Sequence, residues 1–143
     1  WWLKAVDIVH DVGRSINPAI DKGQIEGAYI QGMGWLTMEE CIWDKKGKLL
    51  THGPSTYKIP VAGDVPEHFN VSLFDNANLK PTPFHSKATG EPPLMLGLSA
   101  FFALKDAVAA SAGHKAVVRM EAPATPERIL LACEKAKAQA GLV

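Results

Sequence analysis

The sequence predicts an α+β fold in which strands, one hairpin and about three helices follow one another along the chain. Apolar and β-branched residues with polar interruptions occupy 2–12 and 69–75, a pattern that is typical of strands. Apolar residues recur with helical spacing over 24–40 and 94–112, and 125–137 carries clear helix-capping residues. Strands mixed with helices and a hairpin indicate an α+β protein.

The first part of the chain is predicted as strand, loop and helix. After the strand, 13–23 is predicted as a loop because it contains Gly, Asn-Pro and Asp. The helix from Gln24 to about Glu40 is interrupted by three glycines: Gly27, Gly32 and Gly34. Each glycine costs about 1 kcal/mol relative to alanine, so we expect another helix or a ligand to lie very close to this backbone.

The middle of the chain is predicted to hold a hairpin and short extended segments. Residues 41–51 fit a hairpin that turns at Asp44–Gly47. Prolines bracket an extended segment at 53–60, and 69–75 is a strand. Residues 84–88 are predicted as a short strand that leads into a Gly-Glu-Pro-Pro corner.

The last part is predicted as two helices separated by a strand. Leu94–Ala112 is apolar on most faces, which indicates a central buried helix. Residues 115–120 are predicted as a strand. The final helix, 125–137, has Thr125 as its N-cap and Pro126 at its first helical position.

Composition excludes some classes of partner. The 143 residues include 15 basic and 15 acidic side chains, so no basic excess favours nucleic acid or an anionic membrane, and neither is expected as a partner. The longest apolar run, 94–104, is shorter than the roughly 20 residues that span a bilayer. The two cysteines, Cys41 and Cys133, are far apart, which favours a reduced, cytoplasmic protein.

Glu91 is the strongest candidate for chemistry, because it stands at a stiff corner between Gly90 and two prolines. Each proline biases the residue before it toward extended backbone, and glycine lets another group approach closely. The helix from about Leu94 directs its positive end back toward the corner. These features suit a general base. An acidic residue that stabilises a helix start and caps its amides explains the same pattern.

Gln24 and Gln31 are seven residues apart, so on a helix they share one face beside the glycines. An amide side chain both donates and accepts hydrogen bonds, which suits a polar ring system or a metal oxo group. Tight helix packing with surface glutamines is the alternative. A phosphate-binding glycine loop fits poorly, because no Gly-Lys-Ser/Thr follows.

Five histidines are scattered along the sequence, at positions 10, 52, 68, 85 and 114, and no pair has metal-ligand spacing. We therefore predict no metal-ligating side chain. His85 is near Glu91 in the sequence and could line the same pocket, although an ordinary loop histidine explains it as well.

Four motifs follow one another in a fixed order and cover nearly the whole chain: DVGRSINPAIDKGQIEGAYIQGMG, GPSTYKIP, SKATGEPPL and FFALKDAV. A closing APATPERILLAC completes the series. Together they resemble the C-terminal part of the molybdenum-binding subunit of xanthine dehydrogenase, in the molybdenum hydroxylase family that also contains the aldehyde oxidases.

The resemblance implies a fold, a cofactor and roles for particular residues. Residues 1–143 would form the C-terminal lobe of a molybdopterin-binding domain. Glu91 stands where the family has its active-site base, which activates a hydroxyl group for attack on an electron-poor carbon. Gln24 matches a glutamine that approaches the cofactor, and the backbone around Lys87 to Gly90 would border the same site. The implied cofactor is a molybdenum–pterin, with FAD and [2Fe–2S] clusters on parts outside this chain.

The resemblance also implies a reaction and partners. GEPPL together with PSTYKIP looks more like the xanthine dehydrogenases, which implies hydroxylation of the purines hypoxanthine and xanthine. The implied partners are the purine, the remaining molybdenum-binding region and the iron–sulfur and flavin subunits. The chain begins with two tryptophans directly before a strand, so we expect a fragment of a longer subunit, inactive alone. An aldehyde oxidase-type domain and a non-catalytic assembly domain of the same fold are the alternatives.

Overall fold

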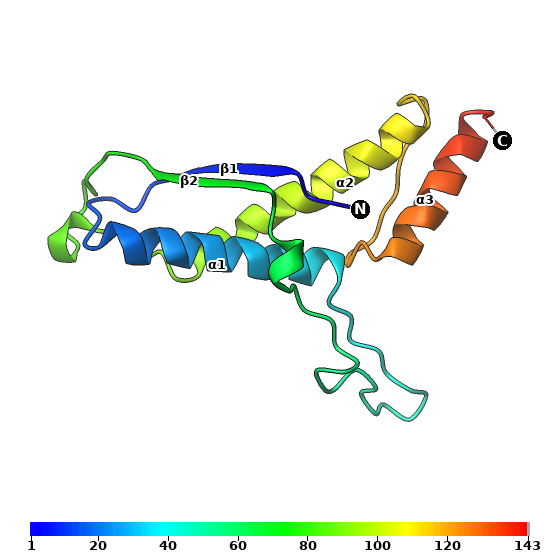
Figure 1. Cartoon of the computed structure of the whole chain (residues 1–143), viewed down its shortest axis with the longest axis horizontal. Coiled ribbons are helices and arrows are strands. Elements are labelled where there is room, and N and C mark those ends of the chain that lie inside the picture. Colours follow the sequence, from blue (N-terminus) through cyan, green and yellow to red (C-terminus); the bar gives the residue numbers. More distant parts are fainter. Residues whose placement is uncertain (143) are drawn as a thin grey trace. The chain divides into compact units, whose positions relative to one another are not determined.

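The computed structural model describes residues 1–142, which form a two-stranded sheet, three α-helices and three short 3₁₀ turns (Figure 1). The strands are β1 (Ala5–His10) and β2 (His68–Leu73), and the helices are α1 (Pro18–Thr37), α2 (Leu98–Ser111) and α3 (Pro126–Gln139). The 3₁₀ turns are Ala62–Asp64, Pro83–His85 and Pro92–Gly97. The predicted α+β class with about three helices is therefore confirmed.

The described chain divides into two compact units. Trp2–Gly32 and Pro60–Gly97 form one of them, here named the sheet unit. Met33–Ile59 and the chain from Leu98 onward form the other, here named the helix-pair unit. The sheet unit therefore contains both strands and most of α1, whereas the helix-pair unit contains α2 and α3.

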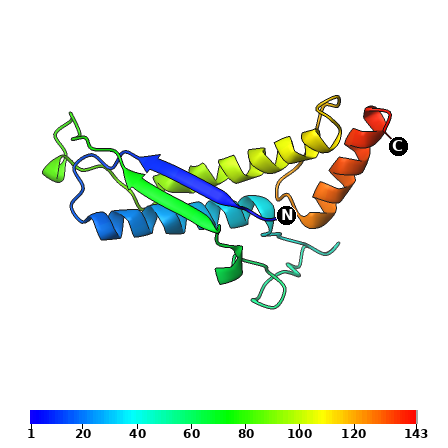
Figure 2. The same ribbon diagram turned by 45° about the horizontal axis from the view of Figure 1, so that its top comes forward.

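The sheet of the sheet unit is a parallel pair (Figure 2). Its register runs from Ala5 opposite His68 to His10 opposite Leu73. Alternate residues of a strand point to opposite faces, and Val6 and Ile8 of β1 are buried. On β1 the opposite face carries Ala5, Asp7 and Val9, which are all exposed. The sheet therefore has one packed face.

Helix α1 supplies the apolar side chains that the sheet unit buries together with its strands. Ile25, Ala28 and Tyr29 are buried on this helix. The Tyr29 ring lies 5.5 Å from the ring of Phe69 on β2, centre to centre. A two-stranded sheet is not stable by itself in water, so this packing against α1 is what stabilises it.

Helix α1 begins earlier than the sequence pattern predicted. The loop prediction for 13–23 is wrong after residue 17, because the helix starts at Pro18. The Asn17 carboxamide oxygen accepts hydrogen bonds from the backbone N–H groups of Ala19 and Ile20, at 3.2 and 3.3 Å. Asn17 is thus an N-cap and Pro18 occupies the first helical position, where a missing N–H costs nothing. The Asn-Pro pair starts a helix here instead of marking a loop.

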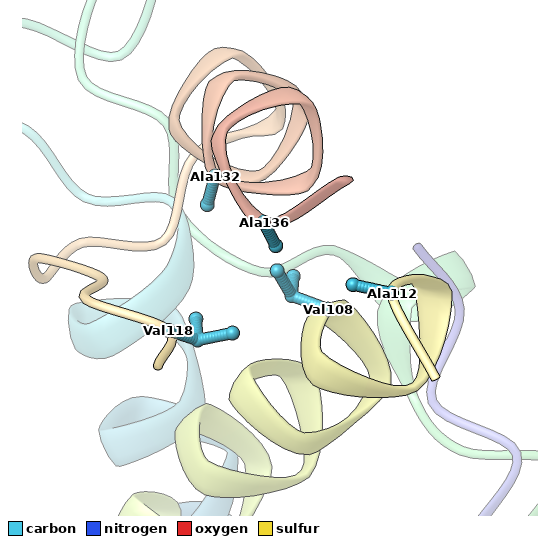
Figure 3. Close-up of a cluster of buried hydrophobic side chains, with 5 residues drawn as sticks. All are labelled: Val108, Ala112, Val118, Ala132 and Ala136. Atoms are coloured by element: carbon cyan, nitrogen blue, oxygen red, sulfur yellow. The ribbon is translucent and has the colours of Figure 1, made fainter. Parts of the chain in front are cut away.

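The helix-pair unit is built on small side chains (Figure 3). Its buried cluster combines residues from α2, from α3 and from the segment between them: Val108, Ala112, Val118, Ala132 and Ala136. Alanine lets two helix backbones approach closely, so the cluster is compact. The N-cap prediction for α3 is confirmed, because Thr125 Oγ1 accepts a hydrogen bond from the Arg128 N–H.

Two predictions in this region are wrong. Residues 115–120 are not a strand in the structure, because no neighbouring strand pairs with them; Val118 is buried against the helices while Val117 is 79% exposed. The α2 region is not a central buried helix either. Ala100 and Val108 are its buried residues, and Phe102 is 56% exposed.

The helical stretch Pro92–Ser111 is also longer than the apolar run read from the sequence. It has 20 residues and a mean hydropathy of 1.5, so by length and composition alone it could cross a membrane. Lys105 and Asp106 end the uncharged run at Leu104, but the helix continues through them to Ser111 with alanine and valine. Core helices of soluble proteins can have the same length and composition, so one such helix is weak evidence for a membrane span.

The loops follow the predictions in part. The turn at Asp44–Gly47 is confirmed, with Trp43 and Leu49 bridged across it. The segment 53–60 is not extended throughout, because Gly53 accepts turn hydrogen bonds from Thr56 and Tyr57. Residues 84–88 form a 3₁₀ turn and an isolated bridge from Ser86 to Gly13 instead of a strand.

Candidate functional site

The Gly-Glu-Pro-Pro corner lies along α1 within the sheet unit. Gly90 is placed so that a Cβ atom added to it would lie 3.7 Å from Oε1 of Gln24. The two residues are far apart in the sequence, and both are exposed. The structure therefore brings together two of the predicted site residues, an amide side chain and an open stretch of backbone.

Gly32 brings the next part of the corner against the same helix. A Cβ added to Gly32 would lie 2.1 Å from the carbonyl oxygen of Leu94, far inside any allowed contact. The expectation that something lies very close to a glycine of this helix is thus confirmed at Gly32. At Gly27 nothing lies within 4 Å of the added Cβ, so that glycine does not serve the same purpose.

Glu91 lies between these two contacts. Its carbonyl oxygen accepts a hydrogen bond from the Leu94 N–H at 3.0 Å, which closes the first turn after the corner. Its side chain is exposed and borders an open recess lined by Ala88, Gly90, Glu91 and Pro92. The carboxylate is therefore accessible while its backbone is fixed on both sides.

Asp21 is a further anchor for the same segment, and the sequence analysis did not single it out. One carboxylate oxygen accepts a hydrogen bond from Ser15 Oγ at 2.5 Å, and the other accepts one from Thr89 Oγ1 at 3.4 Å. Asp21 was assigned to a loop, although its position three residues before Gln24 on a helix would have placed both on one face. It ties the start of α1 to the residue that precedes Gly90.

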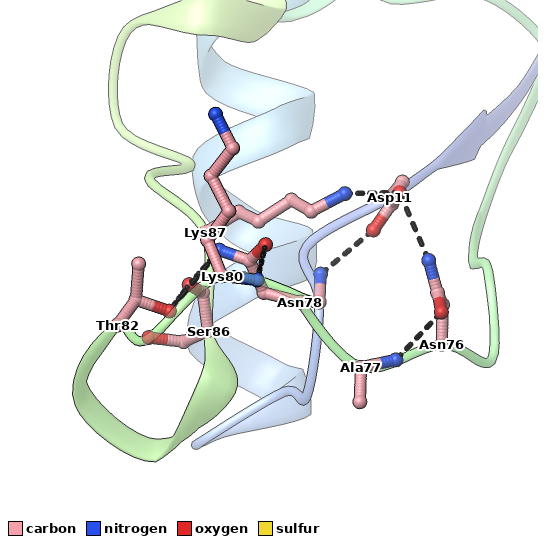
Figure 4. A network of polar contacts seen from close by, with 9 residues as sticks. Asp11, Asn76, Ala77, Asn78, Lys80, Thr82, Ser86 and Lys87 are labelled. Carbon is pink, nitrogen blue, oxygen red and sulfur yellow. Dashed lines mark hydrogen bonds and ion pairs between the residues drawn. The ribbon is translucent and has the colours of Figure 1, made fainter.

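Lys87 is held by Asp11 at the end of β1 (Figure 4). Lys87 Nζ lies 2.5 Å from Asp11 Oδ2, and the Lys87 N–H donates to the Val12 carbonyl at 2.8 Å. Asp11 also accepts hydrogen bonds from the Gly13 N–H and from Asn76. The hydrogen bond from Lys87, followed by that from Gly13, lowers the pKa of Asp11 below its ordinary value.

The loop before Lys87 is organised by its own polar contacts, also drawn in Figure 4. Asn78 Nδ2 donates to Thr82 Oγ1 at 3.1 Å, and Thr82 Oγ1 donates to the Ser86 carbonyl at 2.8 Å. Because Thr82 and Asn78 hold Ser86, the chain enters the segment 87–91 at a defined point. The predicted site segment is thus fixed at its start as well as along α1.

Two other candidates lie outside this arrangement. His85 Nδ1 is 3.1 Å from the Asn78 carbonyl oxygen, and His85 is not among the residues that line the recess. Gln31 is exposed on α1, and the glutamine that lies beside Gly90 is Gln24. Within residues 1–142, no group of three His, Cys, Asp or Glu side chains could hold a metal ion.

Comparison with known proteins gives the class to which this fold and site belong. Residues 2–66 match the family model described as "Molybdopterin cofactor-binding domain". That range contains β1 and the whole of α1 with Gln24. Helix α1 is the helix along which the corner lies.

Individual relatives match the chain over most of its length. Over 132 residues the chain is 54% identical to xanthine dehydrogenase/oxidase of Rattus norvegicus, and over 133 residues it is 53% identical to that of Felis catus; each match covers 89% of this chain. A solved structure, quinoline 2-oxidoreductase from Pseudomonas putida 86, superposes with a TM-score of 0.78 at 32% identity and covers 92% of this chain. The chain belongs to the molybdenum hydroxylase family, as its motifs predicted.

The match is to one part of much longer proteins. The chain spans about a tenth of the length of the curated relatives it matches and 16% of the quinoline 2-oxidoreductase chain. Activity, substrate and partners of the whole relatives therefore do not follow from the match alone.

Proposed function

We propose that this chain contributes one wall of the active site of a molybdenum hydroxylase that hydroxylates purines. In this proposal Glu91 is the general base, and Gln24 with the backbone from Lys87 to Gly90 contacts the molybdenum–pterin cofactor. The observation that carries the proposal is the proximity of Gln24 Oε1 to Gly90, directly beside Glu91. This proximity joins an amide, an open backbone and a carboxylate from two distant parts of the chain.

The residues at the corner fit such a cofactor. A Cβ at Gly90 would lie in ordinary van der Waals contact with Oε1 of Gln24, so the Gly90 backbone and the Gln24 amide lie side by side, where one ligand can contact both. The amide can donate and accept hydrogen bonds at once, which matches the mixed polar edge of a pterin. When bound, the cofactor supplies the redox chemistry and the acidified oxygen nucleophile that hydroxylation requires.

The chain's own contribution to the reaction is the removal of a proton. The carboxylate of Glu91 accepts that proton at one of its side-chain oxygens, which is general base catalysis and contributes about 10²–10⁴-fold to such rates. The following prolines and the hydrogen bond between Glu91 O and the Leu94 N–H restrict the backbone that carries it. Less backbone freedom is then lost when the carboxylate aligns with a substrate.

Similarity supports a purine as the substrate and additional protein as the partner. The relatives at about 50% identity are named as xanthine dehydrogenases, and they are about ten times longer than this chain. We therefore propose that the remaining molybdenum-binding region and iron–sulfur and flavin parts complete the enzyme. The two free cysteines, Cys41 and Cys133, support a cytoplasmic setting.

The substitution Glu91→Gln in the complete enzyme tests the role of the base. We expect kcat to fall by at least about 100-fold with molybdenum and pterin content unchanged, because the isosteric amide cannot accept the proton. Glu26→Gln changes an exposed glutamate that lies on α1 outside the corner; it is the matched control and should retain wild-type turnover. A Glu91→Gln enzyme with near-normal kcat would remove the role assigned to Glu91.

Competing substrates test the purine assignment. With the complete enzyme, kcat/KM for hypoxanthine and xanthine should exceed that for an aromatic aldehyde by at least about tenfold. A preference for the aldehyde would move the protein to the aldehyde oxidase type. Absence of turnover with both classes, in an enzyme shown to contain molybdenum and pterin, would favour a non-catalytic assembly domain.

A further inference from the structure

We infer that Asp21 is a positioning residue for Glu91: it fixes the segment 87–91 along α1 and so sets where the carboxylate stands. The inference rests on the proposed function of Glu91. Asp21 lies within the first of the quoted motifs, but the resemblance gave it no role, and its proposed task is distinct from contact with substrate or cofactor.

The first observation is that both oxygens of one carboxylate are used, each by a different loop. Ser15, which lies just before α1, donates to Oδ2, and Thr89, two residues before Glu91, donates to Oδ1. Asp21 is partly buried, so these hydrogen bonds are less exposed to competing water than those of a surface carboxylate. Hydrogen bonds to a charged acceptor are roughly twice as strong as neutral ones.

The second observation is the order of contacts along α1. Thr89 meets Asp21, Gly90 meets Gln24, and Leu94 meets Gly32. The segment therefore runs beside the helix in the same direction as the helix, with Glu91 between the second and third contacts. Gly90 and Gly32 only leave space, whereas Asp21 makes the attractive polar contact at the start of the run.

The third observation is that the remaining attachment lies upstream of Thr89. The ion pair of Lys87 with Asp11 and the hydrogen bond of its N–H fix the segment to β1. Among the described residues, the contact with Asp21 is the one side-chain hydrogen bond that fixes the chain between Lys87 and the Leu94 turn. A shift of about 1 Å at a reacting group can cost a factor of about 100 in rate.

The experiment uses the complete enzyme with four variants. Asp21→Ala removes both acceptors and places a good helix former in α1. Thr89→Val removes one donor with little change in shape, Thr89→Ser restores the hydroxyl, and Glu26→Ala is the control for loss of an acid from α1. Each variant is assayed for molybdenum and pterin content, for kcat and KM across pH, and for amide hydrogen exchange of the peptide that covers 85–97.

We expect Asp21→Ala to lower kcat about 10- to 100-fold with unchanged cofactor content and with KM altered less than threefold. The pH profile of kcat should shift, and exchange of the 85–97 peptide should become faster. Thr89→Val should show the same pattern more weakly, and Thr89→Ser and Glu26→Ala should behave as wild type. If Asp21→Ala does not fold, the contrast between Thr89→Val and Thr89→Ser decides the question.

Two results would overturn the inference. One is wild-type kcat and wild-type exchange in Asp21→Ala; the other is an equal loss in Thr89→Val and Thr89→Ser. The Glu91→Gln variant separates this from a failure of the proposed function. If Glu91→Gln loses turnover while the Asp21 and Thr89 variants do not, Glu91 keeps its role and the positioning role assigned to Asp21 is wrong. If Glu91→Gln retains turnover, the proposed base itself is wrong.

Discussion

The contacts inside the sheet unit differ in kind from the contacts inside the helix-pair unit. In the sheet unit, polar side chains such as Asp11 and Asp21 tie loops to regular elements. In the helix-pair unit, alanines and valines of α2 and α3 form an apolar cluster. Polar ties fix particular atoms in space, whereas close packing of small side chains fixes helix backbones.

The difference shows why the candidate site lies where it does. A base must hold one carboxylate in place, and directional hydrogen bonds on the neighbouring backbone do this more specifically than apolar contact. The sheet unit has these ties around Glu91, while the helix-pair unit has its best-defined contacts in an apolar interior. Substitutions that attack each kind of contact can measure this difference.

The largest expected effect comes from filling the contact at Gly32. In Gly32→Ala the new methyl group would meet the Leu94 carbonyl at 2.1 Å, a backbone atom that cannot rotate away. We expect the free energy of unfolding to fall by about 3 kcal/mol, the upper part of the range for overpacking. Denaturant unfolding of the 143-residue chain measures it.

Gly27→Ala is the matched control on the same helix. Nothing lies within 4 Å of its added Cβ, so the higher helix propensity of alanine should raise the free energy of unfolding by about 0.5–1 kcal/mol. Opposite signs for the two glycines would confirm that close approach is confined to Gly32. Equal effects would contradict the contact with Leu94.

A smaller effect is expected in the apolar cluster of the helix-pair unit. Val108 is 2% exposed, and Val108→Ala removes two methyl groups at about 0.8 kcal/mol each, plus a cavity term. We expect a loss of about 2 kcal/mol in the free energy of unfolding, with hydrogen exchange of the 85–97 peptide unchanged. Val117→Ala, at a position that is 79% exposed, should change stability by less than about 0.5 kcal/mol.

The smallest effect concerns how the stability contributed by the Lys87–Asp11 ion pair depends on pH. The pKa of Asp11 is lowered from 3.8, first by the hydrogen bond from Lys87 and then by that from Gly13. A carboxyl with a lowered pKa in the folded state stabilises the fold above its unfolded pKa, and this contribution is lost as pH falls through the folded pKa. Because both side chains are more than a third exposed, the contribution is small.

A carboxyl-carbon NMR titration measures this tie directly. In Lys87→Met the pKa of Asp11 should rise toward its ordinary value, because the largest cause of the lowering is gone. Lys22→Met, which removes an exposed lysine of α1, should leave it unchanged. An unaltered Asp11 titration in Lys87→Met would show that Lys87 does not hold the end of β1 in solution.

Local signals predicted part of the fold. Alternating apolar residues identified β1 and β2, and Thr125 with Pro126 identified the start of α3, because these patterns depend on residues within one element. The strand predicted at 115–120 failed because a strand also needs a neighbour, which no local pattern can supply. The burial predicted for α2 failed because Phe102 and Leu98 are apolar yet exposed.

The candidate site was predicted as separate residues, not as an arrangement. Glu91 and Gln24 stood out by motif and resemblance, and their catalytic and cofactor roles remain predictions. The proximity of Gln24 to Gly90 depends on how residues far apart in the sequence meet. Asp21 was missed because Asn17-Pro18 was taken for a loop, and with the helix start misplaced the shared face of Asp21 and Gln24 was hidden.

The parallel pairing of β1 with β2 has a consequence for biosynthesis. Ala5 pairs with His68, so β1 leaves the ribosome long before its partner exists. At about 5–20 residues per second, the wait is on the order of 3 to 13 s. During that interval α1, which is complete earlier, is the element of these 143 residues that can cover Val6 and Ile8. A contact between β1 and α1 therefore precedes the pairing of the two strands during synthesis.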